Sequence, residues 1–186
     1  MMVRLMGYRV AAVWAAAVVL GVWGAGGCRE AAAPPDAQPV VPVQEPVSVT
    51  LEPIDVEQYA AVLAGHRGQV VLVDFWATWC APCVAAFPHT VELHRRLADR
   101  GLVVISVSLD DPEDADAVRA FLAGQQATFE NYHSRYGVGS KAFELFDLDA
   151  VPCVKLYDRE GHLQHVFSGG EATTAEEIDR ALEALL

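Results

Sequence analysis

VVLVDFWATWCAPC, residues 70–83, is the stretch that decides the fold of this chain. Its first seven residues are apolar apart from one aspartate and rich in β-branched side chains, which indicates a buried strand. Two cysteines with two residues between them follow, and they stand where an amphipathic helix begins. The sequence therefore predicts a strand that delivers a pair of thiols to a helix N-terminus.

This position favours redox chemistry for the two cysteines. The first turn of a helix has unpaired N–H groups and the positive end of the helix dipole, so it stabilises a thiolate relative to a thiol. A thiolate attacks disulfides, and a second cysteine three residues on can release the mixed disulfide that forms. The competing interpretation is half of a zinc site, but structural zinc takes four ligands, and the sequence has no second CxxC and no HxxxH motif.

Two further features resemble the thioredoxin superfamily. Pro88 stands where thioredoxins kink the active-site helix, and Val151-Pro152 stands at the place of their cis-proline. The order of the WCxPC segment, a strand over 102–110 and Val151-Pro152 is similar to that of the membrane-anchored TlpA/ResA-type proteins. For residues 49–186 the resemblance implies an α/β domain of thioredoxin-like fold, with a central mixed β-sheet and helices on both faces.

The resemblance implies an enzyme, a thiol-disulfide oxidoreductase that reduces protein disulfides with a Cys80–Cys83 dithiol and no cofactor. Cys80 would be the exposed nucleophile, and Cys83 the buried thiol that resolves the mixed disulfide. Asp74 would be the buried acid that exchanges a proton with Cys83 through a water, with its pKa raised by burial. The alternative for Asp74 is an edge-strand acid that faces solvent. The residues expected to contact substrate are Trp79, Ala81, Pro82, Val151 and Pro152.

Two positions depart from the TlpA/ResA pattern. Ala86 stands where that family often carries a glutamate, so Asp74 would have to act without it. Cys153 directly follows Pro152, where relatives usually have threonine or another small polar residue. We favour a packing role for Cys153 as a small buried hydrophobe. The alternative is a third thiol that exchanges with the CxxC pair or helps to bind a soft metal.

Other classes of function stay open as alternatives. A copper- or soft-metal-handling module would use Cys80 and Cys83, with Cys153 as an optional third ligand. Copper-delivery relatives, however, have a wider cysteine spacing and a matching histidine, which are missing here. A peroxidase of related fold needs a cysteine in a Thr/Pro/Arg pocket, which residues 78–83 do not reproduce. The intact dithiol argues against an inactive partner-binding domain. The six histidines show no ligand spacing, so we expect surface positions for all of them and no metal site.

The N-terminus is typical of a targeting segment followed by a linker. Residues 1–27 combine Arg4 and Arg9 with an uncharged apolar run, as in a signal peptide or a signal anchor. The small residues before Cys28 resemble a bacterial lipoprotein cleavage site, after which Cys28 would carry the lipid. Residues 28–48 are rich in proline and alanine and predict an extended spacer. We therefore expect an extracytoplasmic or periplasmic protein that a lipid or an anchor holds at a bacterial membrane, with plain secretion as the alternative.

The charge of the chain bears on its partners. The formal net charge is −12, and the leader contributes two arginines and no acid, so the rest of the chain is more acidic still. Such a surface repels phosphate backbones and anionic headgroups, which argues against nucleic-acid binding and leaves membrane attachment to the leader. The expected partners are protein disulfide substrates and a membrane thiol-disulfide electron donor that renews the dithiol.

Hydrophobic patterning predicts the remaining elements. We expect strands at 70–76, 102–109, 154–157 and 163–167, and no hairpin before the first helix, where 47–51 could supply one strand. We expect helices at 55–64, 82–98, 111–124, 140–146 and 174–186, and a loop at 132–139. Asp55 and Thr174 are the predicted N-caps of the first and the last helix.

Overall fold

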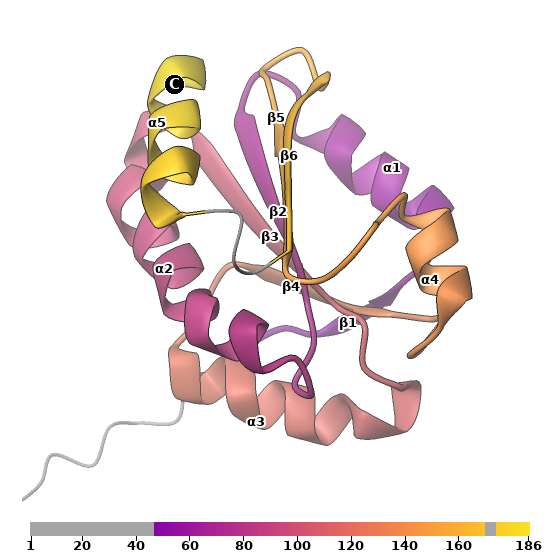
Figure 1. The fold of residues 1–186 in the computed structure, drawn as a ribbon. Helices are drawn as coiled ribbons and strands as arrows, with labels where there is room; N and C mark the ends of the chain where they lie inside the picture. The colour runs from indigo at the N-terminus through magenta and orange to yellow at the C-terminus, as the bar shows by residue number, and fades with distance from the viewer. Residues whose placement is uncertain (1–46, 170–173) are drawn as a thin grey trace, which may run out of the picture. The chain divides into compact units, whose positions relative to one another are not determined.

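The apolar run at residues 70–76 forms a central strand of a six-stranded mixed sheet in the computed structural model (Figure 1). The structure describes residues 47–169 and 174–186, so the leader, Cys28 and nearly all of the linker lie outside the described residues. The strand order is β1-β4-β3-β2-β5-β6, in which the first four run parallel, β5 is antiparallel to β2, and β6 is antiparallel to β5. The strands are β1 (Glu52–Ile54), β2 (Val70–Trp76), β3 (Leu102–Ser108), β4 (Glu130–Ser134), β5 (Cys153–Tyr157) and β6 (Leu163–Ser168).

Helices cover both faces of this sheet, which confirms the predicted fold class (Figure 1). One face carries α1 (Val56–Gly65) and α4 (Ser140–Leu145). The other face carries α2 (Ala81–Leu97), α3 (Ala115–Gln125) and α5 (Ala175–Leu185). The short 3-10 helices η1 (Ala98–Arg100) and η2 (Pro112–Asp114) lie at the end of α2 and before α3. Within the described ranges, no helix has the length and apolar character needed to cross a membrane.

The two faces of β2 belong to two separate hydrophobic cores. Leu72 and Trp76 pack with α2, α3 and α5, whereas Val73 and Phe75 pack with α1 and α4. All seven residues of β2 are buried, as expected for a strand between neighbours in a sheet that is covered on both sides. Because side chains alternate along a strand, Asp74 lies on the α2 face together with Leu72 and Trp76.

The predicted starts of three helices are confirmed. Asp55 caps α1 and Thr174 caps α5, and each forms a capping box with the residue three positions on. α2 begins directly after Cys80, so the CxxC segment stands at a helix N-terminus as expected. Pro88 lies inside α2, as the thioredoxin resemblance implies.

Two expectations are wrong at the β1 edge of the sheet. Residues 130–134 form β4 where the sequence predicts mainly loop. Among the described residues a single strand precedes α1, as expected, but it is β1 at 52–54 and not 47–51. β4 reads Glu-Asn-Tyr-His-Ser, which has little strand character by itself, and it becomes a strand because it pairs with β1 on one side and β3 on the other. His133 of this strand is consequently buried and not on the surface.

Candidate active site

The two cysteines of the CxxC segment form a disulfide at the start of α2. Cys80 is the N-cap residue of the helix, and its Sγ accepts a hydrogen bond of 3.3 Å from the backbone N–H of Cys83. A donor of the first helical turn thus already points at the sulfur that would carry the negative charge after reduction. Cys80 is 6% exposed and Cys83 2%, so the expectation of an openly exposed Cys80 is wrong for the disulfide form, although the order of accessibility holds.

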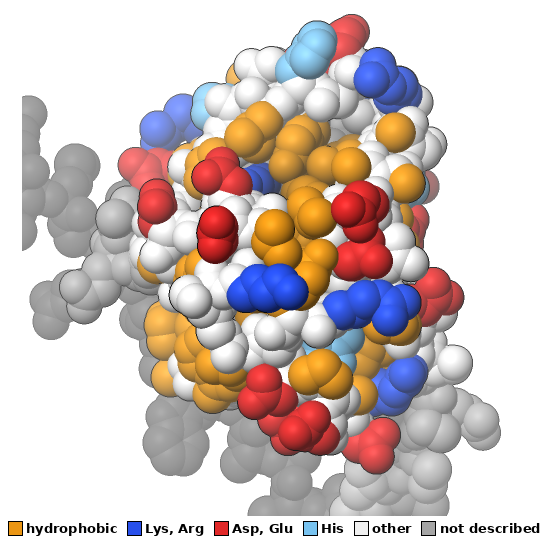
Figure 2. All heavy atoms as spheres, turned by 90° about the vertical axis from the view of Figure 1, so that its right-hand side faces the viewer, with side chains coloured by type: hydrophobic (Ala, Val, Ile, Leu, Met, Phe, Trp, Pro, Cys, Tyr) orange, Lys and Arg blue, Asp and Glu red, His pale blue; other side chains and the backbone are white. Residues whose placement is uncertain are grey.

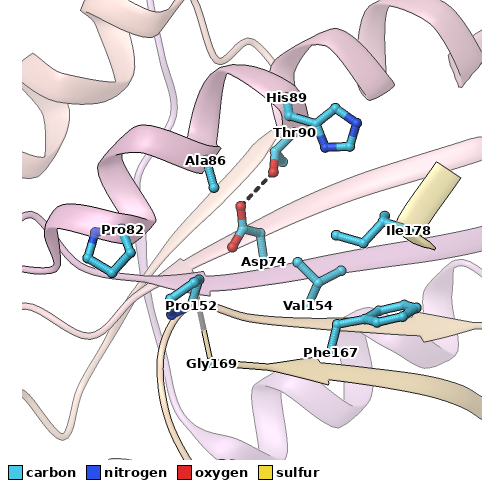
Figure 3. Close-up of a pocket in the computed structure, with 10 residues that line it drawn as sticks. All are labelled: Asp74, Pro82, Ala86, His89, Thr90, Pro152, Val154, Phe167, Gly169 and Ile178. Carbon is cyan, nitrogen blue, oxygen red and sulfur yellow. Dashed lines mark hydrogen bonds between the residues drawn. The ribbon is translucent and has the colours of Figure 1, made fainter. Parts of the chain in front are cut away.

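The residues expected to contact substrate lie around this disulfide. Trp79 is 51% exposed, and Ala81 and Pro82 at the start of α2 are exposed as well. The Val151–Pro152 peptide bond is cis, as the resemblance implies. Pro82 and Pro152 line one cavity, so the cis-proline loop lies beside the first turn of α2 (Figure 3). Contact of these residues with a substrate stays a prediction.

A cavity of about 80 Å³ lies between β2, α2, α5 and the cis-proline loop (Figure 3). Asp74 borders it from β2, and Thr90 of α2 donates a hydrogen bond of 2.7 Å from Oγ1 to Asp74 Oδ2. Figure 3 shows the other carboxyl oxygen directed toward the side of Pro82 and Pro152. The cavity wall is mainly apolar, and its polar side chains are Asp74, Thr90 and His89. A cavity of this size has room for water beside them, through which a proton can move between the carboxyl group and its neighbours.

Burial raises the pKa of Asp74 from 3.8 to about 6. The loss of solvation disfavours the charged carboxylate, while the hydrogen bond from Thr90 and the charge of His89 act in the opposite direction. Asp74 is 5% exposed in an interior strand, so the alternative of a solvent-facing edge acid is wrong. Cys83 and Thr90 are both buried and lie seven residues apart on one face of α2. A carboxyl group that titrates near neutral pH on this side of the sheet is suited to exchange a proton with Cys83.

Cys153 lies on the opposite face of the sheet from the disulfide. It begins β5 opposite Phe75 and belongs to the core beneath α1 and α4, whereas Cys80 and Cys83 belong to the core beneath α2. Its side chain is fully buried, and burial raises the pKa of its thiol to about 11. This placement supports the packing role of Cys153 and gives no support to a thiol that exchanges with the CxxC pair.

We predict that Cys153 resists alkylation in the folded protein. In oxidised full-length protein with a Cys28→Ser substitution, iodoacetamide at pH 8 should modify Cys153 at least about 100-fold more slowly than free cysteine, because both thiolate formation and access are suppressed. Mass spectrometry after timed quenching measures this rate, and the same protein in urea should react fully. Rapid labelling of the native protein would contradict the buried position.

Asp110, which sequence reasoning missed, binds the segment that directly precedes the disulfide in the chain. It is 1% exposed and follows β3, and its carboxylate accepts hydrogen bonds from the Thr78 N–H at 3.0 Å and from Ser108 Oγ at 2.6 Å. The Thr78 hydroxyl donates to the same carboxylate. Because Thr78 precedes Trp79 and Cys80, this buried carboxylate fixes the segment that leads into the disulfide. An aspartate after a strand is a weak signal in a sequence, since aspartate begins many turns.

An Asp110→Ala substitution should destabilise the protein by about 3 kcal/mol, because it leaves three donors of Thr78 and Ser108 without their acceptor. Urea unfolding followed by circular dichroism measures the loss. Asp114→Ala is the matched control, since Asp114 is exposed and makes no side-chain cap bond, and it should change stability by less than about 0.5 kcal/mol. Equal effects of the two substitutions would contradict the assigned role of Asp110.

The expected surface position is wrong for His133 and confirmed for the exposed His162 and His165, while the other three histidines are half-buried. His133 is 5% exposed, and its Nε2 lies 2.8 Å from the backbone oxygen of Asp110. His89 is half-buried on the wall of the Asp74 cavity, with Nε2 3.0 Å from Oδ1 of Asp179 on α5. In the part of the chain that the structure describes, no group of three or more His, Cys, Asp and Glu side chains could hold a metal ion.

The mixed sheet, the disulfide at the start of α2 and the cis-proline beside it define a thioredoxin-like protein built for thiol-disulfide chemistry. Comparison with known proteins leads to the same class. The chain belongs to the AhpC/TSA family, which it matches over residues 44–166.

Individual relatives support the narrower resemblance to ResA. The chain is 28% identical to the thiol-disulfide oxidoreductase ResA of Oceanobacillus iheyensis over 115 residues, which is 62% of this chain and 57% of that protein, less than two thirds of its length. It is 26% identical to ResA of Geobacillus kaustophilus over 131 residues, 70% of this chain and 71% of that one. A crystal structure of a DsbE-type thiol:disulfide interchange protein from Chlorobium tepidum is 28% identical, with a TM-score of 0.58 over 66% of this chain and 84% of that one.

Proposed function

We propose that this thiol-disulfide oxidoreductase works outside the cytoplasm and reduces disulfide bonds in proteins. The observation that carries the proposal is the CxxC pair at the N-terminus of α2, with exposed Trp79 beside it and the cis-proline loop and buried Asp74 close by. Trp79 supplies an exposed apolar contact for a substrate segment. The relatives ResA and DsbE are named as a thiol-disulfide oxidoreductase and a thiol:disulfide interchange protein, and these names support disulfide reduction as the reaction.

The reaction moves two electrons from the dithiol to the substrate. The Cys80 thiolate attacks one sulfur of the substrate disulfide, the S–S bond of the substrate breaks, and the released thiolate takes a proton from water. Cys83 then gives its proton to Asp74 and attacks the Cys80 sulfur of the mixed disulfide. The Cys80–Cys83 bond forms as the bond between Cys80 and the substrate breaks, and the second substrate sulfur leaves as a thiolate that takes a proton from water.

The partners and the location follow from this reaction and from the N-terminus. A dithiol outside the cytoplasm is used up in each cycle, so a membrane thiol-disulfide electron donor renews it. The signal segment at 1–27 directs the chain across the membrane, and either a lipid on Cys28 or the uncleaved segment holds it there. The linker at 28–48 keeps the domain at a distance from the lipid surface.

The alternative functions gain no support from the structure. Cys153, the optional third ligand of a soft-metal site, packs in the other core and is separated from Cys80 and Cys83 by the sheet. A peroxidase pocket would need the Thr78 hydroxyl near the reacting sulfur, and that hydroxyl donates to Asp110.

A trapping experiment tests the proposed function. A Cys83→Ser protein, expressed at full length in its native host, should accumulate disulfide-linked adducts through Cys80, because the thiol that resolves them is missing. Gel electrophoresis without reductant, followed by mass spectrometry, identifies the linked proteins. A Cys80→Ser, Cys83→Ser double variant is the control and should trap nothing. A single variant that also traps nothing would contradict the proposed function.

A further inference from the structure

The proposed function requires the buried carboxyl group of Asp74 to gain and lose a proton in every catalytic cycle. Asp74 is 5% exposed in β2, so bulk water does not reach it freely. The cavity beside it offers one route. Among the described residues that line this cavity, His89 is the one titratable side chain besides Asp74 itself. Ala86, one helical turn before His89, has no titratable group.

The geometry of His89 suits proton transfer between the cavity and solvent. Its Nε2 lies 3.0 Å from Asp179 Oδ1, and a carboxylate can only accept, so Nε2 carries the hydrogen and Nδ1 is left as the basic nitrogen. The His89 side chain is 23% exposed and that of Asp179 35%. Figure 3 shows the imidazole on the α2 wall next to Thr90, which holds the Asp74 carboxyl group.

We infer that His89 carries protons between Asp74 and solvent, and that Asp179 holds the imidazole in position for this transfer. The inference rests on the proposed function, because the proton on Asp74 comes from Cys83. Histidine is the side chain that exchanges protons most readily near neutral pH. His89 acts through Asp74 and is therefore a relay residue and not a catalytic one.

Charged groups from several elements surround His89. From β2, Asp74 borders the same cavity, and from α5, Asp179 accepts the hydrogen bond of Nε2. On α2, Arg96 also binds Asp179, with 2.9 Å between Nη2 and Oδ2, and Glu92 lies 3.5 Å from Arg96 Nη1. The described cavity residues of β5 and β6 carry no charge. Arg96 and His89 therefore share the carboxylate of Asp179.

The relay balances in both halves of the cycle. When substrate is reduced, Cys83 gives its proton to Asp74, and Asp74 passes it through water in the cavity to His89, which loses it to solvent. When the donor dithiol attacks the Cys80–Cys83 disulfide, the Cys83 sulfur leaves with the electron pair of that bond and takes a proton from Asp74. His89 then returns a proton from solvent to Asp74. The second thiol of the donor attacks its partner sulfur in the mixed disulfide, so the Cys80 thiolate is released and the donor is left oxidised.

Single-turnover kinetics of the full chain test the relay. The reduced protein is mixed with insulin between pH 5 and pH 9, and tryptophan fluorescence follows formation of its disulfide. His89→Ala should slow the reaction about tenfold or more near neutral pH and flatten its pH profile. Imidazole added to the solution should restore most of the lost rate, because it can enter the space that the side chain leaves. His94→Gln on the same helix, which does not line this cavity, is the control and should keep the rate of the wild type.

Two further variants keep the test decisive if His89→Ala misfolds. His89→Gln preserves size and a polar contact with Asp179 but cannot carry a proton, so it should be as slow as His89→Ala. Asp179→Asn should slow the reaction by a smaller factor, about threefold, because the imidazole stays but is less well held. Unchanged rates in the His89 variants, or slow rates with an unchanged pH profile and no effect of imidazole, would overturn the relay. A wild-type protein that reduces no insulin would overturn the proposed function and the relay together.

Discussion

Replacing Cys80 by alanine should lower the rate of insulin reduction to that of dithiothreitol alone. Cys80 is the sulfur at the N-cap of α2, where the first-turn N–H groups stabilise a thiolate. Cys83 cannot replace it as nucleophile, because Cys83 is 2% exposed and lies one turn further into the helix. Insulin turbidity, measured with dithiothreitol as the electron source, gives the rate directly.

A serine at the same position separates chemistry from stability. Cys80→Ser keeps an N-cap side chain that accepts a hydrogen bond, whereas Cys80→Ala loses it, so alanine should cost about 1 kcal/mol more in the free energy of unfolding of the reduced protein. Both variants should nevertheless be equally inactive, because neither has a thiolate at this position. Activity of either variant above the dithiothreitol background would mean that another thiol attacks the substrate, and the assignment of Cys80 would be wrong.

The strand, the CxxC pair and the helix that follows could be predicted because their signals are local. Six apolar positions interrupted by one aspartate, then two cysteines, then an amphipathic segment leave few alternatives for residues 70–97. The burial of Asp74 follows from the same run, since an acid in the middle of a strand that is covered on both faces of the sheet is shielded from solvent. The capping boxes at Asp55 and Thr174 are also local signals.

The contacts of Asp110, His89 and Cys153 could not be predicted, because each depends on how distant segments pair. Asp110 reaches Thr78 only through the register of β2 against β3, and His89 meets Asp179 only because α5 packs beside α2. Cys153 faces away from the disulfide because of the register of β5 against β2, and a slip of one residue would reverse its face. Strand β4 was missed for the same reason, since its pairing partners and not its own sequence make it a strand.

Replacing Asp74 by asparagine should stabilise the oxidised protein at neutral and alkaline pH while slowing its chemistry. The native pKa of about 6 lies above the value of 3.8 for an exposed aspartate, so the native state binds the proton more tightly than the unfolded state. The contribution of Asp74 to the free energy of unfolding is therefore fully present below about pH 4 and is lost as the pH rises to about 6. The difference in pKa corresponds to about 3 kcal/mol.

The Asp74→Asn protein lacks this titration, so its stability relative to the wild type should rise with pH. The gain should be about 3 kcal/mol at pH 8 and near zero at pH 4, provided that the amide oxygen still accepts the hydrogen bond from Thr90. Urea unfolding of the two oxidised proteins at both pH values measures the difference. Asp99→Asn, which removes an exposed carboxyl group, is the control and should show no such dependence.

The same variant should resolve mixed disulfides more slowly, because Cys83 loses the acceptor for its proton. General acid–base catalysis by one positioned group accelerates a reaction by roughly 100-fold or more. We therefore expect the attack of Cys83 on the mixed disulfide to slow by up to about 100-fold near pH 7. The deficit should shrink as the pH rises, since hydroxide can then remove the proton from Cys83 directly. A stable Asp74→Asn protein with the wild-type rate at every pH would show that the buried carboxyl group only destabilises the fold and takes no part in proton exchange.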